Sequence, residues 1–103
     1  MLIESLHEVF GNTYCISEQV SYNGNRKDIE DKIYNDIPVT DILVKSISHL
    51  DGVKLTFGDG EFLLYRVSGT EPIIRIMSES HNEAQSKHYI EIGRNYLKSK
   101  GVI

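Results

Sequence analysis

Three short apolar segments separated by turn residues dominate the second half of the chain. Asp51-Gly52 precedes the segment 53–57, Gly58-Asp59-Gly60 leads to 62–67, and a five-residue loop leads to 73–78. Apolar runs of this length bounded by turn residues predict β-strands, and such short connections predict antiparallel neighbours. A sheet of this kind has to bury one face against a second layer, so the chain is constrained to a layered, sheet-based fold.

The first half of the chain adds two strands and a helix. Residues 13–22 alternate between apolar and polar side chains, which predicts a strand with one solvated face. Asn25 is placed to cap a helix that ends before Pro38 and carries an isoleucine every four residues, at Ile29, Ile33 and Ile37. Residues 41–48 are predicted to form the other strand.

The N-terminal segment shows helical spacing. Its apolar residues share one face of a helix, and Gly11 follows in the position of a C-terminal glycine; these residues are Leu2, Leu6, Val9 and Phe10. We therefore expect residues 1–12 to be a helix or linker that belongs to a preceding domain. Residues 13–103 would then form the domain itself.

The C-terminal segment also predicts a helix. Ser80 and Glu83 have the spacing of a capping box, and Gly101 stands where the helix would end. The expected buried face consists of Ala84, His88, Ile92 and Tyr96. All segments together predict an α+β, two-layer domain, with a mostly antiparallel sheet of four or five strands and helices packed on one face.

Composition narrows the class of protein. A chain of 103 residues allows one domain, and 11 basic against 15 acidic residues give a net charge of −4. Nucleic-acid binding depends on Lys and Arg that neutralise phosphates, so this balance argues against it. No apolar run approaches the ~20 residues that span a bilayer, and Met1–Glu4 has no signal-peptide pattern. The single Cys15 excludes an internal disulfide and a Cys-cluster metal site. We expect a cytoplasmic protein without nucleic-acid or membrane partners.

The loop between the last two predicted strands carries the chemistry. Gly69 permits close approach of a ligand to the main chain, and Ser68 and Thr70 add two hydroxyl groups at the same place. Successive N–H groups in such a turn can form an anion-binding nest. Arg66 shares strand parity with Ser68, so both side chains should point to one side of the sheet. A guanidinium beside hydroxyls and amides suits a phosphate dianion.

Two interpretations of this loop remain open from its residues alone. Ser-Gly-Thr-Glu-Pro can be a polar hairpin connection, since turn residues are common between strands. The flanking Arg66 and Arg75 favour a ligand site, because charges on otherwise apolar strands face either solvent or a ligand. We expect Arg75 to lie on the solvated face and to pair with Glu71.

The segment Arg66–Glu79, with the sequence RVSGTEPIIRIMSE, resembles the phosphate-binding signature of the α-D-phosphohexomutases. These enzymes include phosphoglucomutase/phosphomannomutase and phosphoglucosamine mutase. Asp51-Gly52-Val53-Lys54, the Gly58-Asp59-Gly60 turn and the closing helix fit the same pattern. The resemblance covers roughly residues 13–100 and corresponds to the C-terminal, fourth domain of the family, which has a TBP-like fold.

This resemblance implies a defined role for the chain. The C-terminal domain of the family holds the phosphate that is not being transferred, while phosphoryl transfer moves a phosphate between the 1- and 6-positions of a hexose. By position, Arg66, Ser68, Gly69 and Thr70 would contact the phosphate of a hexose phosphate or inorganic phosphate. Glu71 and Arg75 match the motif and would support those contacts. The other domains of the parent enzyme would be the partners.

The catalytic parts of the family are not expected in this chain. Its Ser80-His81-Asn82 lacks the flanking residues of the family's phosphoserine segment and is better interpreted as a helix start. Asp59 alone cannot replace the several aspartates of the family's magnesium site. We expect no catalytic or metal-binding residue here, with Mg²⁺ and the phosphoserine in the full-length enzyme. The alternative hypothesis is a free-standing anion-binding or protein-interaction module with the same fold and no mutase activity.

Overall fold

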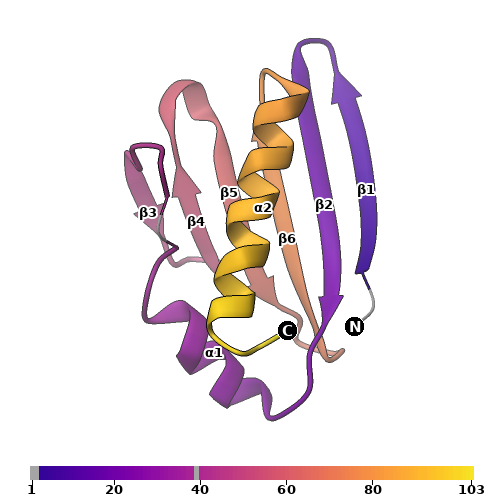
Figure 1. The fold of residues 1–103 in the computed structure, drawn as a ribbon, viewed down its shortest axis with the longest axis vertical. Helices are drawn as coiled ribbons and strands as arrows, with labels where there is room; N and C mark the ends of the chain where they lie inside the picture. The colour runs from indigo at the N-terminus through magenta and orange to yellow at the C-terminus, as the bar shows by residue number, and fades with distance from the viewer. Residues whose placement is uncertain (1–2, 39) are drawn as a thin grey trace.

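The computed structural model describes residues 3–38 and 40–103, which form a single antiparallel sheet with two α-helices (Figure 1). The sheet has six strands in the order β1-β2-β6-β5-β4-β3. The strands are β1 (Ile3–Phe10), β2 (Thr13–Ser21), β3 (Ser46–Ser48), β4 (Val53–Thr56), β5 (Phe62–Val67) and β6 (Ile73–Ser80). The helices are α1 (Arg26–Tyr34) and α2 (Glu83–Ser99), and a short 3₁₀ turn, η1 (Gly58–Gly60), joins β4 to β5. The predicted α+β architecture is confirmed, with six strands in place of four or five.

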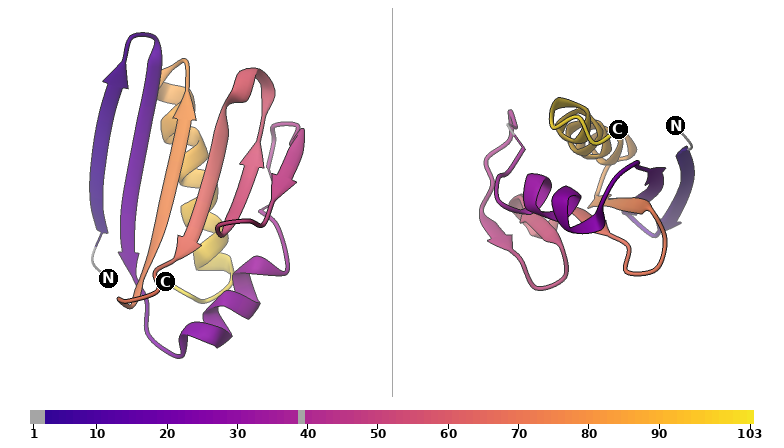
Figure 2. Two further views of the ribbon diagram at one scale, coloured as in Figure 1. Left: turned by 180° about the vertical axis from the view of Figure 1, so that it is seen from behind. Right: turned by 90° about the horizontal axis from the view of Figure 1, so that it is seen from below.

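The core lies between the sheet and α2, which crosses one face of the sheet (Figure 1). Alternate residues of the central strands point into it, as expected for a half-buried sheet, among them Leu63, Tyr65, Ile74 and Ile76. The opposite face is covered by no helix in the described part of the chain (Figure 2). No helix among the described residues is long and apolar enough to cross a membrane.

The buried stripe of α2 differs from the predicted one. Ile92 and Tyr96 are buried as expected, but Ala84 is exposed. The sheet-facing residues of α2 are instead Ser86, Tyr89, Ile90, Ile92, Gly93, Tyr96 and Leu97. The reason is geometric, because strict four-residue steps drift around a helix of 3.6 residues per turn, whereas alternating steps of three and four stay on one face.

The prediction of a helix in residues 1–12 is wrong. Residues 3–10 form β1, which pairs with β2 from Ile3↔Val20 to Phe10↔Thr13. Gly11 has a φ of +60°, the feature of a two-residue hairpin turn with glycine in its first position. Leu6 and Val9, assigned to one helical face, are 56% and 59% exposed and lie on opposite sides of the strand. Met1 and Leu2 lie outside the described residues. Pairing with the edge of β2 provides hydrogen-bond partners for the backbone of this segment. A short helix would leave its terminal backbone groups unpaired and its apolar face uncovered.

The helix starts are set by asparagine residues. Asn25 caps α1 as predicted, since its side chain accepts hydrogen bonds from the N–H groups of Lys27 and Asp28. The predicted capping box at α2 is wrong, because Asn82 is the cap and accepts from the Gln85 N–H at 3.1 Å. Ser80 is instead the last residue of β6, and its hydroxyl is bound to Ser86 at 2.6 Å. The interpretation of Ser80-His81-Asn82 as a helix start is thus confirmed through its third residue.

Two other predicted elements are shorter than expected. Residues 41–48 contribute only the three residues of β3 to the sheet, and Asp41 instead bonds His88 on α2 at 2.9 Å. The helix α1 ends at Tyr34, so Ile29 and Ile33 are buried in it while Ile37 lies beyond its end and is 37% exposed.

Glu61 connects the β4–β5 turn to the start of α2. One carboxylate oxygen accepts from the buried Tyr89 hydroxyl at 2.7 Å, and the other accepts from the His81 N–H at 3.0 Å. Burial by itself would raise the pKa of Glu61, but the hydrogen bonds from His81 and Tyr89 outweigh it and hold the pKa below the ordinary value. The ionised carboxylate therefore stabilises the folded state.

We expect Glu61→Gln to lower the free energy of unfolding at pH 7 by about 1.5–3 kcal/mol, the range for hydrogen bonds to a charged group. The folded-state pKa is depressed, so this contribution is fully present above the unfolded-state pKa near 4.5 and disappears as the pH falls through the folded-state pKa. Urea unfolding of both proteins between pH 7 and pH 3 should show the difference shrinking with acid. Glu83→Gln, which removes an exposed carboxylate in the same region, is the control; an equal effect of the two changes would refute the role of Glu61.

Candidate anion-binding site

Three segments that are distant in the sequence meet at one end of the sheet. They are the β5–β6 loop (68–72), the turn Asp51-Gly52 before β4, and helix α1, all on the lower side of Figure 1. The β4–β5 turn and the start of α2 lie at the opposite end. The loop singled out from the sequence is thus flanked by a helix and a second turn.

Ser68 organises the loop from within. Its N–H donates to the carbonyl of Ile73 at 3.0 Å, which closes the connection between the two strands. Its hydroxyl oxygen accepts from the N–H groups of Thr70 and Glu71, both at 3.3 Å. Two backbone donors therefore converge on one oxygen, and the Ser68 O–H hydrogen remains able to donate. Gly69 and Thr70 are exposed at the tip, where a ligand can reach them.

Both ends of the loop are tied to the rest of the domain. The Val67 N–H donates to the Tyr34 hydroxyl at 2.8 Å, and the Tyr22 N–H donates to the Pro72 carbonyl at 3.0 Å. Burial raises the pKa of Tyr34, with a further increase from Glu30, while the hydrogen bond from Val67 and the charges of Arg26 and Arg66 oppose it. The Tyr34 hydroxyl thus stays protonated at neutral pH, and the loop is held in place before any ligand arrives.

Arg66 lies on the sheet face that carries no helix, next to the loop. Its guanidinium pairs with the exposed carboxylate of Asp51, with an Nη1–Oδ2 distance of 3.0 Å, and its side chain remains 40% exposed. Gly52 lets this turn approach the strand closely, because a Cβ added there would lie 2.4 Å from the Tyr65 carbonyl oxygen and 2.9 Å from the Arg66 Cβ. The Asp51-Gly52 turn therefore orients the Arg66 guanidinium while the side chain stays partly exposed to solvent.

Arg75 lies beyond the loop on β6, and Glu71 lies within the loop. Arg75 is opposite Arg66 in the β5–β6 register, so two cations stand side by side on the open face. Like charges at directly opposed positions repel, and an anion bound nearby would relieve that repulsion. The expected Glu71–Arg75 ion pair is wrong, because no such pair forms among the described residues. Glu71 is exposed at the loop tip.

Arg26 is a neighbour of the loop that the sequence analysis missed. It is the first residue of α1, and its two terminal guanidinium nitrogens lie 3.8 Å from the position that a Cβ on Gly69 would occupy. In the sequence it is part of a mixed charge run, which is typical of a solvated helix face. Nothing local distinguishes it from Lys27, because only the packing of α1 beside the loop brings it to Gly69.

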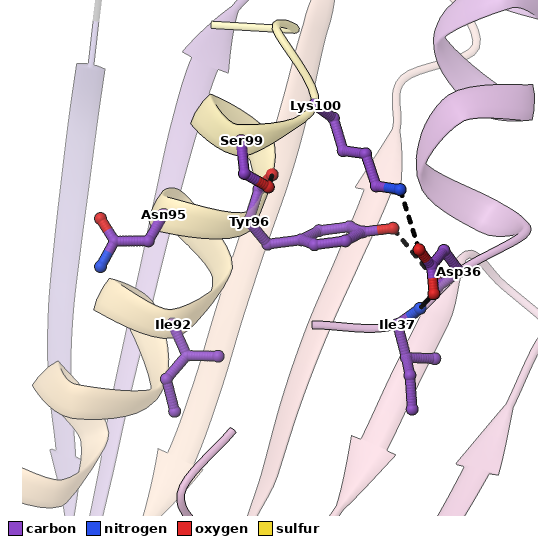
Figure 3. A pocket seen from close by; sticks show the side chains of 7 residues that line it. All are labelled: Asp36, Ile37, Ile92, Asn95, Tyr96, Ser99 and Lys100. Carbon is purple, nitrogen blue, oxygen red and sulfur yellow. Dashed lines mark hydrogen bonds and ion pairs between the residues drawn. The ribbon is translucent and has the colours of Figure 1, made fainter. Parts of the chain in front are cut away.

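The other chemically capable groups lie elsewhere. The depression shown in Figure 3 has a volume of about 380 Å³ and lies between the end of α2 and the segment after α1, where Lys100 pairs with Asp36 at 2.9 Å. Burial raises the pKa of the Cys15 thiol to about 11, with further increases from Glu79 and Glu8, so the thiol is protonated at neutral pH. Within residues 3–38 and 40–103, no group of three His, Cys, Asp or Glu side chains is placed to hold a metal ion.

Comparison with known protein families supports the family resemblance that was stated from the loop motif. Residues 18–92 match the family model described as "Phosphoglucomutase/phosphomannomutase, C-terminal domain". That range contains β5, the loop and β6 but leaves out β1, which lies in the segment that the sequence analysis assigned to a helix or linker.

Individual proteins that match part of this chain carry names from the same group of enzymes. A phosphoglucomutase/phosphomannomutase of Thermococcus kodakarensis is 48% identical over 52 residues, or 50% of this chain. Probable phosphoglucosamine mutases of Methanothermobacter thermautotrophicus and Pyrococcus horikoshii are 42% and 31% identical over 52% and 70% of this chain. The matched regions span 11%, 12% and 16% of these three relatives, respectively. The chain is therefore similar to a small part of much longer proteins.

Proposed function

Since the chain belongs to the family of phosphoglucomutase/phosphomannomutase C-terminal domains, we propose that it anchors the phosphate of a sugar phosphate in a phosphohexomutase. The phosphate held here is the one that is not being transferred during exchange between the 1- and 6-positions of the hexose. Arg66, Ser68, Gly69 and Thr70 make the contacts in this proposal, and Arg75 and Glu71 support them.

The observation that carries the proposal is the convergence of donors at the β5–β6 loop. Two backbone N–H groups already share the Ser68 oxygen, and the exposed Arg66 guanidinium lies on the adjacent strand. For a phosphate dianion to use these N–H groups, one of its oxygens would take the place of the Ser68 oxygen as their acceptor, and its charge would match the Arg66 guanidinium. Because none of these donors recognises a hydroxyl pattern, the loop would accept either phosphate of a bisphosphorylated sugar.

The remaining chemistry is assigned to other parts of the parent enzyme. The phosphoserine and Mg²⁺ expected from the resemblance belong to its other domains in this proposal, and these domains are the partners of this chain. Anchoring contributes by fixing the sugar so that the reacting oxygen lies close to the phosphoryl donor, which lowers the entropic part of the barrier. The isolated chain would bind phosphate without catalysing the exchange. A cytoplasmic location remains a prediction of the sequence.

An amide NMR titration of this chain tests the proposal. Inorganic phosphate should shift the resonances of Ser68, Gly69 and Thr70 in a saturable manner, with a dissociation constant near 1 mM, or about −4 kcal/mol, since one domain supplies only some of the contacts. Glucose 1-phosphate and mannose 1-phosphate should bind with similar affinities. Resonances of the Gly58–Gly60 turn at the far end of the sheet should not move.

The alternative outcomes are clear. Unshifted loop resonances up to 50 mM phosphate would refute anion binding by this loop. Equal shifts at the loop and at Gly58–Gly60 would indicate a general effect of ionic strength and would also refute it.

A further inference from the structure

Arg26 lies beside the loop but has no role in the proposed site so far. Its terminal nitrogens Nη1 and Nη2 are both 3.8 Å from the position of a Cβ on Gly69, so the two-nitrogen edge of the guanidinium faces the loop backbone. Gly69 leaves this space open because it has no side chain. The Arg26 side chain as a whole is 51% exposed.

Glu30 holds this guanidinium in a useful orientation. The Glu30 carboxylate forms an ion pair with Nε of Arg26 at 3.1 Å, one helical turn further along α1. The pair occupies Nε and leaves both terminal nitrogens for another acceptor. Arg26 can therefore bind an anion through its terminal nitrogens while its contact with Glu30 is kept.

Two N–H groups in the first turn of α1 already have a side-chain acceptor. The Asn25 side chain accepts from the N–H groups of Lys27 and Asp28, at 2.8 and 3.4 Å. The positive feature that α1 presents to the loop is thus the Arg26 side chain rather than free N–H groups at the end of the helix.

Arg26 and Arg66 come from separate elements and meet at the same loop. The positive charges of both arginines act to lower the pKa of the Tyr34 hydroxyl, and this hydroxyl accepts a hydrogen bond from the Val67 N–H at 2.8 Å. A phosphate dianion at the loop would therefore lie among guanidinium groups supplied by α1 and by β5. Two cations suit a dianion better than one, and a guanidinium edge can bind two phosphate oxygens at once.

We propose that Arg26 is a further phosphate-contacting residue of this site, binding through its terminal nitrogens while Glu30 positions it through Nε. This inference rests on the proposed phosphate-binding function of the loop. It adds helix α1 to a site that the sequence motif confines to the β5–β6 connection.

Phosphate titrations of matched variants test the inference. Arg26→Gln should raise the dissociation constant for inorganic phosphate about three- to tenfold, as expected for a partly exposed cation. Arg26→Lys keeps the charge without the fork and should give a smaller increase. Lys27→Ala is the control, because it removes a cation from the same helical turn without the contact to Gly69 and should leave affinity within about 1.5-fold, as for a screened surface charge.

A direct readout accompanies these affinities. In the wild-type chain the Arg26 Nε–Hε resonance should shift with the same midpoint as the Gly69 amide. The role of Arg26 would be overturned if Arg26→Gln bound phosphate with the affinity of Lys27→Ala while Arg66→Ala still weakened binding. The proposed function would then stand. Absence of phosphate binding by the wild-type chain would overturn both. The amide spectrum of each variant shows whether it is folded. If Arg26→Gln does not fold, Arg26→Lys is measured in its place.

Discussion

Replacing Arg66 by alanine is expected to weaken phosphate binding by about 1.5–3 kcal/mol, or roughly 10- to 150-fold, the range for hydrogen bonds to charged groups. Arg66 supplies a charged donor on the strand that leads directly into the loop. Asp51 is 75% exposed, so it becomes solvated when its partner is removed and no buried charge is left behind. The effect should therefore fall on binding much more than on stability.

Isothermal titration or NMR titration at one fixed salt concentration measures this loss. Ser68→Ala should reduce affinity less than Arg66→Ala does, because it removes a neutral hydroxyl. Arg75→Ala is the matched control, since it removes a guanidinium from the opposed position of the neighbouring strand, and its effect should be smaller still. An equal loss from Arg66→Ala and Arg75→Ala would contradict the division between contacting and supporting arginines.

The largest effect on stability is expected from Gly52→Ala. A Cβ at this position would lie 2.4 Å from the Tyr65 carbonyl oxygen, and that oxygen belongs to a central strand with no freedom to move away. Gly52 also has a φ of +94°, which disfavours a side chain. Clash and backbone strain together should lower the free energy of unfolding by about 3 kcal/mol or more. For a domain of this size, each kcal/mol corresponds to a decrease in Tm of about 4–8 °C.

Gly60→Ala isolates the contribution of the clash. Gly60 has a φ of +75°, and nothing lies within 4 Å of its Cβ position, so only the backbone strain of about 1–2 kcal/mol applies. Thermal unfolding of both variants should therefore show a clearly larger loss for Gly52→Ala. If the two variants were equally destabilised, the turn before β4 would not pack against β5 as closely as described here.

Local sequence patterns predicted most of the sheet and the position of the β5–β6 loop. β2, β4, β5 and β6 lie within one or two residues of their predicted limits, because alternation and turn residues are properties of neighbouring positions. The cap at Asn25 was predictable for the same reason. The loop motif was recognisable because its residues are consecutive along the chain.

Errors arose where two local interpretations were both possible. Leu6 and Val9 fit a helical face, yet the segment became β1 because the edge of β2 was available for pairing. Ser80 has the spacing of a capping residue, yet it extends β6, where it pairs with Tyr14 and binds Ser86. In both places contact with another element decided between two locally compatible alternatives.

The sequence by itself determined which residues form β2, β4, β5 and β6, which loop carries the family motif, and which cation precedes that loop. These features depend on residue type and short spacing, which act before the chain is folded. Only the tertiary structure decided that residues 3–10 extend the sheet, that Asp51 pairs with Arg66, and that Arg26 faces Gly69. The reason is that each of these depends on contacts between separate elements, and no periodicity along the chain encodes which exposed cation is brought to the loop.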